Sequence, residues 1–284
     1  MEDKFIEAGK KVKLIVSDID GTLLNSNKQL TQENLHAIQK AKEQNLLFTI
    51  CTGRIVSMLE YYIHTLEIET PIITCNGAVI WDPILNKPMF DVPMDKEELM
   101  SMLEFCKFNQ LDYGVFTLGT NYFSRNSVRL DNYRNYNEFA KANNRPTMKL
   151  GYFDDDFHCL DGINVYKLLI YDRNPEQIKM VEERLGTLKK TGYTTSLPGL
   201  LDISEKSVNK GQGVQKLAEH LKLRPEEVCT IGDFDNDIPM LEYAGFSVAM
   251  GNALPNVKEK AFYVTSSNDE NGLAKVMNRY ILRK

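Results

Sequence analysis

Two short acidic runs stand far apart in this chain, and their residue types suit the binding of a divalent cation. Asp18 and Asp20 follow one apolar stretch, and Asp233 and Asp237 follow another. Each stretch is typical of a buried strand, so both runs are expected at one edge of a sheet. Crowded carboxylates raise each other's pKa unless a cation neutralises them, and oxygen ligands suit a hard cation. We therefore predict a Mg²⁺ and phosphate site at this edge, with Asp233 and Asp237 holding the metal.

The same residues can support phosphoryl transfer. Asp18 can attack phosphorus to form an aspartyl-phosphate, and Asp20, two positions on, can act as general acid and then as base. Gly21 would let the backbone approach the phosphate closely. The hydroxyl of Thr52 and the ammonium group of Lys210 can stabilise the transferring oxygens. The chain thus offers a nucleophile, an acid and base, and phosphate-binding groups.

Strands alternate with helices in both terminal parts of the chain. Strands are expected at 13–17, 46–50, 71–74, 228–231, 246–250 and 262–265, and helices at 31–45, 55–63, 214–221, 238–244 and 273–280. This alternation predicts parallel βαβ units, hence an α/β core. In such a sheet the ligand site lies beyond the carboxyl ends of the strands, so the loops of Asp18, Thr52, Asn76 and Asp233 should converge.

The middle of the chain has a different pattern, which indicates an inserted domain. A capped helix begins near Asp95, and a strand at 163–171, a helix at 175–188 and a strand or loop at 191–197 follow. Residues 121–156 show no clear periodicity. We expect an α+β cap at 82–197 and a catalytic core formed by 1–81 and 198–284.

Composition narrows the classes of function. The chain has 284 residues, of which 43% are hydrophobic, and a net charge of -5, which argues against a nucleic-acid surface. Its five cysteines are odd in number and lack CxxC spacing, which is typical of reduced thiols in the cytoplasm. No apolar stretch is long enough to span a bilayer. We expect a cytoplasmic protein that binds neither nucleic acid nor membrane and is a monomer or homodimer.

Each motif also has a simpler explanation when taken alone. Asp and Gly favour turns, so Asp18 and Gly21 could merely end a strand. Acidic residues are favoured at helix N-termini, which could explain Asp233 and Asp237. A single lysine such as Lys210 is usually a solvated charge. It is the occurrence of all the motifs in order that favours the catalytic interpretation.

These motifs resemble those of the haloacid dehalogenase (HAD) superfamily, specifically its Cof-type, subclass IIB phosphatases. The residues that carry the resemblance are Asp18-Ile19-Asp20-Gly21-Thr22-Leu23-Leu24, Thr52-Gly53-Arg54, Asn76-Gly77-Ala78, Lys210-Gly211 and Gly232-Asp233-Phe234-Asp235-Asn236-Asp237. The segment from Ser207 to Met250 looks closest to the broad-specificity bacterial sugar-phosphate phosphatases. The resemblance implies a Rossmann-like core, a parallel sheet flanked by helices, with an inserted α+β cap domain.

The resemblance also implies roles for individual residues. Asp18 would be the nucleophile and a metal ligand, and Asp20 the general acid and base, with its backbone carbonyl on the metal. Thr52 and Lys210 would hold the phosphoryl group, and Asp233 would bind Mg²⁺ directly. Asp237 would act through metal-bound water. The residues expected to contact substrate are Gly53, Arg54, Asn76, Gly77 and Asn236.

Together these observations predict a Mg²⁺-dependent phosphatase that hydrolyses phosphomonoesters of small metabolites through an aspartyl-phosphate. A sugar phosphate is the first candidate substrate. Two alternatives are a phosphomutase of the same superfamily and a non-catalytic phospho-receiver or binding module. Asp20 argues against the receiver, because a receiver has no need of an acid that also activates hydrolytic water.

Overall fold

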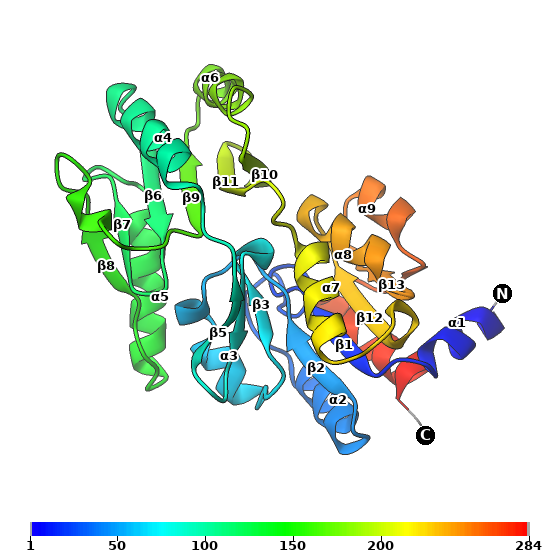
Figure 1. Ribbon diagram of the computed structural model, residues 1–284. Helices are drawn as coiled ribbons and strands as arrows, with labels where there is room; N and C mark the ends of the chain where they lie inside the picture. The colour runs from blue at the N-terminus through cyan, green and yellow to red at the C-terminus, as the bar shows by residue number, and fades with distance from the viewer. Residues whose placement is uncertain (1, 283–284) are drawn as a thin grey trace. The chain divides into compact units, whose positions relative to one another are not determined.

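A computed structural model describes residues 2–282, and the chain divides into two compact units (Figure 1). The first unit contains Met1–Gly53, Tyr62–Phe90 and Asn209–Lys284. The second contains Arg54–Tyr61 and Asp91–Val208. Residues 1, 283 and 284, which we included in the predicted core, lie outside the described part of the chain.

A five-stranded parallel sheet forms the centre of the first unit. Its strands, in spatial order, are β14 (Tyr263–Val264), β13 (Phe246–Ala249), β12 (Val228–Gly232), β1 (Leu14–Ser17) and β2 (Leu47–Ile50). All residues of β1, β12 and β13 are buried. Such strands can be apolar throughout because both faces of the sheet are covered. The predicted α/β class and parallel pairing are confirmed.

Helices flank this sheet and supply the apolar core. They are α1 (Glu2–Gly9), α2 (Gln32–Glu43), α3 (Glu60–Thr65, at the boundary between the units), α7 (Lys210–His220), α8 (Ile238–Tyr243), α9 (Pro255–Lys260) and α10 (Gly272–Val276), which a π-helical turn, Met277–Ile281, follows. One buried cluster unites β1, α7 and α8 through Leu14, Val16, Val214, Leu217 and Met240. The predicted helix N-cap is present, since the Thr31 hydroxyl accepts a hydrogen bond from Asn34 N at 3.3 Å.

The third predicted strand only partly joins the parallel sheet. β3 (Ile72–Thr74) forms a separate three-stranded sheet with β4 (Val79–Asp82) and β5 (Lys87–Asp91). A single parallel bridge between Cys51 and Ile73 links β3 to the chain after β2. This contact still brings Thr52 beside the end of β3, because Thr52 N donates to Ile73 O at 2.9 Å.

The second unit is an α+β domain with a six-stranded sheet. In spatial order its strands are β10 (Thr191–Leu197), β11 (Leu200–Glu205), β9 (Lys167–Tyr171), β6 (Asp112–Phe116), β7 (Thr120–Phe123) and β8 (Lys149–Tyr152). Helices α4 (Lys96–Phe108) and α6 (Pro175–Leu185) share one apolar cluster with the sheet. The Asp95 cap is present, with a 3.1 Å bond from Glu98 N, but the Glu98 carboxylate accepts from Lys189 N instead of completing a capping box.

Residues 121–156, which lacked a clear period, contain a helix and two strands. Helix α5 (Leu130–Ala142) joins β7 to β8, which pair in parallel. Its residue Tyr133 packs against the rings of Phe116 and Phe123, with centroids 5.4 and 5.1 Å away. Because these contacts come from two strands outside the helix, the polar sequence of α5 alone gives little indication that it is a helix.

The boundaries of the units differ from the expected break points at 81/82 and 197/198. Residues 82–90 cluster with the first unit because β5 pairs with β4, whereas residues 198–208 cluster with the second because β11 pairs with β9 and β10. Residues 54–61 also belong to the second unit. Among residues 2–282, no helix combines the length and apolar character needed to cross a membrane.

Candidate active site

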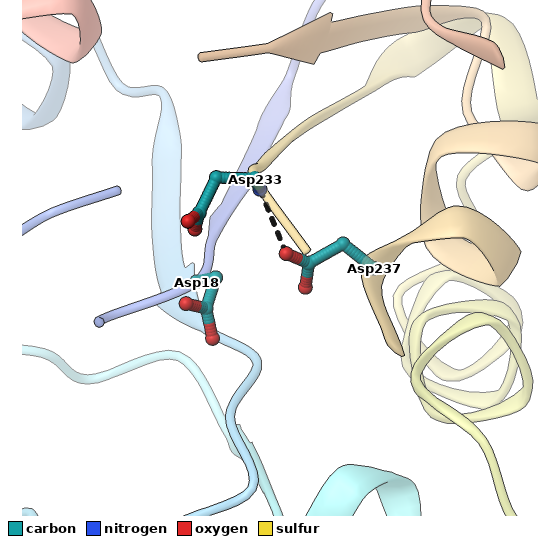
Figure 2. A group of neighbouring side chains, drawn as sticks. All are labelled: Asp18, Asp233 and Asp237. Atoms are coloured by element: carbon teal, nitrogen blue, oxygen red, sulfur yellow. Dashed lines mark hydrogen bonds between the residues drawn. The ribbon is translucent and has the colours of Figure 1, made fainter. Parts of the chain in front are cut away.

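Three aspartates from two strand ends meet at the carboxyl edge of the parallel sheet. One carboxylate oxygen from each of Asp18, Asp233 and Asp237 lies within 4.8 Å of the others (Figure 2). Asp18 follows β1 and Asp233 follows β12, which pair side by side in parallel. Parallel strands place their carboxyl ends together, so sheet pairing brings distant aspartates into one group.

Lys210 supplies the positive charge of this group. Its Nζ lies 2.6 Å from Asp18 Oδ1 and 2.5 Å from Asp237 Oδ1. Lys210 is the first residue of α7, which Asn209 caps by accepting a hydrogen bond from Gln212 N at 2.9 Å. Only 1% of the Lys210 side chain is exposed. The lysine is therefore a buried counter-ion and not a solvated charge.

Asp237 is fixed on both of its oxygens. While Oδ1 contacts Lys210, Oδ2 accepts hydrogen bonds from Asp233 N at 2.8 Å and Phe234 N at 3.0 Å. The side chain thus closes the turn that carries Asp233 and is completely buried. A β-carbon at Gly232 would lie 2.6 Å from the Asp237 side chain, so the last residue of β12 needs to be a glycine.

Asp233 is held against the loop of residues 18–30 that follows β1, which we call the β1 loop. Thr22 Oγ1 donates a 2.8 Å hydrogen bond to Asp233 Oδ1, and Asn252 Nδ2 lies 3.4 Å from Oδ2. Gly21 has φ +86°, and a β-carbon there would collide with the Asp233 carboxylate. The close approach of loop and carboxylate therefore requires glycine both for its backbone conformation and for its missing side chain.

Asp20 is in the β1 loop, but its side chain is outside the group of three carboxylates. Its Oδ1 lies 3.0 Å from Lys28 Nζ, in an ion pair within the same loop. About 40% of the Asp20 side chain is exposed, against 9% for Asp18. The two aspartates of the first motif thus occupy different environments, as a nucleophile and a proton donor would need.

The remaining predicted residues of the first unit lie on the neighbouring loops. Thr52 is buried, and its carbonyl accepts a hydrogen bond from Asn76 N at 2.9 Å. Asn236 Nδ2 donates to Asn76 Oδ1 at 3.1 Å, which joins the loop after β3 to the turn after β12. A β-carbon on Gly53 would lie 3.0 Å from Asn76 Oδ1, so these two residues are also close.

Gly77 and Arg54 differ in their placement. Gly77 has φ +103°, and its α-carbon faces the backbone carbonyl of Asn209, immediately before Lys210. Gly77 therefore allows the loop after β3 to pack against the start of α7. Arg54 belongs to the second unit, although its motif partners Thr52 and Gly53 belong to the first.

The aspartates carry more negative charge than one lysine can balance. Burial raises the pKa of Asp18 to about 8; Lys210 opposes this shift, and the charges of Asp237 and Asp233 add to it. Burial and Asp237 raise the pKa of Asp233 to about 6. Burial also opposes the charge of Lys210, but Asp18 and Asp237 outweigh it and raise the lysine pKa. A hard divalent cation bound to these oxygens would relieve the repulsion.

Two residues of the site were missed from the sequence. Thr22 belongs to the first motif, but nothing in the sequence indicated that its hydroxyl would bind Asp233. Asn252 follows β13, so its position after a parallel strand was the available signal. Both contacts depend on pairing between strands that are distant in the sequence.

Comparison with known proteins identifies the family. Residues 15–277 match the haloacid dehalogenase-like hydrolases. The chain belongs to this family. A Bacillus subtilis (strain 168) 5-amino-6-(5-phospho-D-ribitylamino)uracil phosphatase is 30% identical over 285 residues, which cover 93% of this chain and 96% of the relative. Phosphatase YwpJ of the same strain is 31% identical over 286 residues, with 95% and 100% coverage.

Solved structures agree with this assignment at the level of the fold. A HAD subclass IIB sugar phosphatase superposes with a TM-score of 0.80 at 23% identity, over 96% of this chain and all of the other. The predicted resemblance to Cof-type phosphatases is confirmed. The family match and the two phosphatase relatives show that this HAD hydrolase is a phosphoric monoester hydrolase.

Proposed function

We propose that this HAD hydrolase is a Mg²⁺-dependent phosphatase that acts on small phosphorylated metabolites through an aspartyl-phosphate on Asp18. The observation that carries the proposal is the group of buried Asp18, half-buried Asp233 and buried Asp237 at the end of a parallel sheet, with Lys210 bound to Asp18 and Asp237. The excess of carboxylates suits a hard divalent cation, which Asp18, Asp233, the Asp20 carbonyl and, through water, Asp237 would hold. Bound Mg²⁺ would supply positive charge for the phosphoryl oxygens.

The chemistry then divides between the two aspartates of the first motif. Lys210 binds Oδ1 of Asp18, so we assign the attack on phosphorus to Oδ2. A bond forms between Oδ2 and phosphorus, the ester P–O bond breaks, and Asp20 protonates the leaving alkoxide. Asp20 then removes a proton from water, whose oxygen attacks phosphorus and displaces Asp18. The products are an alcohol and inorganic phosphate.

Lys210 and Thr52 are proposed to bind the transferring phosphoryl group. Lys210 is pre-oriented by its two ion pairs, so its charge needs little reorganisation during the reaction. Gly53, Arg54, Asn76, Gly77 and Asn236 are proposed to contact the substrate. Support comes from the hydrogen bond between Asn76 and Asn236, which fixes two amides on loops of the first unit.

The two units are proposed to divide the work between catalysis and recognition. We assign catalysis to the first unit, which contains the aspartates and Lys210, and substrate selection to the second, as an inserted cap. Sugar phosphates are our first candidate substrates. A relative named for 5-amino-6-(5-phospho-D-ribitylamino)uracil makes that phosphorylated compound a second candidate.

A cytoplasmic location is also part of the proposal. Within the described residues 2–282, none of the five cysteines forms a disulfide, and four of them are buried. Free thiols are typical of a reducing compartment.

The experiment that tests the function is phosphate release from an aryl phosphate by the purified chain. We expect release with Mg²⁺, loss of release with EDTA, and recovery when Mg²⁺ is added back. Asp18→Asn is the matched control and should retain no more than a few per cent of the parental rate. Metal-independent release, or an active Asp18→Asn variant, would contradict the mechanism.

A panel of phosphorylated metabolites then separates the candidates. A preference for sugar phosphates or for the ribitylaminouracil phosphate would identify the substrate class. A phosphomutase would instead depend on a bisphosphate for turnover, and a phospho-receiver would release no phosphate from any compound.

A further inference from the structure

Asn252 connects three segments of the first unit, and none of the sequence motifs includes it. Its Nδ2 donates a 2.9 Å hydrogen bond to Gly21 O and lies 3.4 Å from Asp233 Oδ2. Its Oδ1 accepts a 2.9 Å hydrogen bond from Asn268 N. One exposed amide thus contacts the β1 loop, the turn after β12 and the chain after β14.

The segment around residues 268–269 binds the β1 loop at two more points. Asn268 Nδ2 donates to Leu24 O at 3.0 Å. The Asp269 carboxylate accepts from Ser26 N at 2.8 Å and from Ser26 Oγ at 2.7 Å. Several hydrogen bonds thus attach the β1 loop to the rest of the first unit. Of the residues outside the loop that make them, Asn252 lies nearest to the aspartates.

The contacts of Asn252 orient two groups that the proposed metal site needs. Gly21 O belongs to the residue directly after Asp20, so the bond from Asn252 restrains the backbone that carries Asp20. Asp233 is restrained by Thr22 at Oδ1 and by Asn252 near Oδ2. Outer hydrogen bonds of this kind orient metal ligands, and their loss typically costs about 10-fold to 100-fold in metal affinity or activity.

We propose that Asn252 is a positioning residue that sets Mg²⁺ affinity by holding the Asp20–Gly21 backbone and the Asp233 carboxylate in one arrangement. This inference rests on the metal site of the proposed function. It assigns no contact with substrate to Asn252. The amide acts through its neighbours.

The chain offers a matched control in Asn256. This residue is also exposed, and its Nδ2 donates to an aspartate of the same region, Asp235 Oδ1, at 2.6 Å. Neither Asn256 nor Asp235 belongs to the group of three carboxylates or to the β1 loop. Replacing Asn256 therefore removes a comparable surface hydrogen bond without releasing that loop.

The experiment compares Asn252→Ala, Asn256→Ala and the parent after treatment with EDTA. Calorimetry measures the Kd for Mg²⁺, and thermal unfolding with and without Mg²⁺ measures the stabilisation by the metal. For Asn252→Ala we expect about a tenfold rise in Kd and a smaller Mg²⁺-dependent increase in Tm. The Mg²⁺ concentration for half-maximal phosphate release should rise by the same factor as the Kd. Asn256→Ala should match the parent.

Several outcomes would overturn the proposal. An Asn252→Ala variant whose Kd equals that of the parent would do so, as would equal changes in both variants. If Asn252→Ala lowered the Tm in EDTA but left the Mg²⁺-dependent increase in Tm unchanged, the contact of Asn252 would be merely structural. A parent that fails to bind Mg²⁺ would also refute it. A parent that binds Mg²⁺ but hydrolyses no phosphate ester would refute the proposed function and leave the role of Asn252 intact.

Discussion

Lys210 Nζ lies 2.6 Å from Asp18 Oδ1, although 192 residues separate the two in the sequence. Both side chains are buried, so the pair is shielded from water and depends on accurate geometry. The same ammonium group contacts Asp237, which holds the turn of Asp233. One lysine therefore links the proposed nucleophile to the proposed metal ligands.

Replacing Lys210 should reduce both stability and activity. Lys210→Met leaves Asp18 and Asp237 buried without their cation, and such losses cost roughly 3–5 kcal/mol. We expect a large fall in Tm in EDTA, part of which Mg²⁺ should restore by neutralising the same carboxylates. Lys216→Met, on the same helix but only half-buried, is the control. Equal Tm values for the two variants would contradict the role of Lys210.

The stability of the metal-free protein should fall as pH rises through the range set by Asp18. Its pKa is raised to about 8, so between its ordinary pKa and about 8 the folded chain keeps a proton that the unfolded chain has lost. The unfolded state then binds fewer protons, and the free energy of unfolding decreases with pH. Asp233, with a pKa of about 6, contributes the same sign.

Thermal unfolding in EDTA across this pH range measures the effect. The fall in Tm should be smaller for Asp18→Asn, which removes the titrating group. Mg²⁺ displaces the proton, so its affinity should increase with pH up to about 8. A parent and an Asp18→Asn variant with parallel pH profiles would show that Asp18 does not titrate in this range.

Gly21→Ala should damage the metal site more than it damages the fold. Positive φ at an alanine costs roughly 1–2 kcal/mol, and the new β-carbon would also push the Asp233 carboxylate away. We expect at least about a tenfold loss of Mg²⁺ affinity, measured by calorimetry. Gly162→Ala is the control, because Gly162 also has positive φ, +72°, but has no atom within 4 Å of the added carbon. Weaker Mg²⁺ binding in both variants would argue against the steric explanation.

Asp20→Asn should separate the two halves of the reaction. An aryl phosphate has a good leaving group that needs little protonation, so Asp18 can still be phosphorylated. Hydrolysis should then be slow, because the group that removes a proton from water is missing. Mass spectrometry should detect phosphate on Asp18 in this variant and none in the double variant Asp18→Asn, Asp20→Asn. Unmodified Asp18 during slowed turnover would count against the aspartyl-phosphate.

Much of the first unit could be predicted because its signals are local. The strands β1 and β12 are fully buried, mostly apolar runs, and the helix after Thr31 has a cap and an apolar face at helical spacing. The polar helix α5 was missed because it packs against Phe116 of β6 and Phe123 of β7, which lie outside the helix. The break between the two compact units differs from the expected one because the pairing of β5 with β4, and of β11 with β9 and β10, is not encoded in their own short segments.

By itself, the sequence determined which chemistry was available: aspartates directly after buried strands, a glycine beside them, and a lysine before a helix. Only the tertiary structure decided that Lys210 binds Asp18 and Asp237, that Asp20 lies apart beside Lys28, and that Asn252 joins Gly21 to the neighbourhood of Asp233. The physical reason is that residue type and local periodicity specify strands and turns. Distances between side chains of different loops arise from sheet pairing and packing across the whole unit.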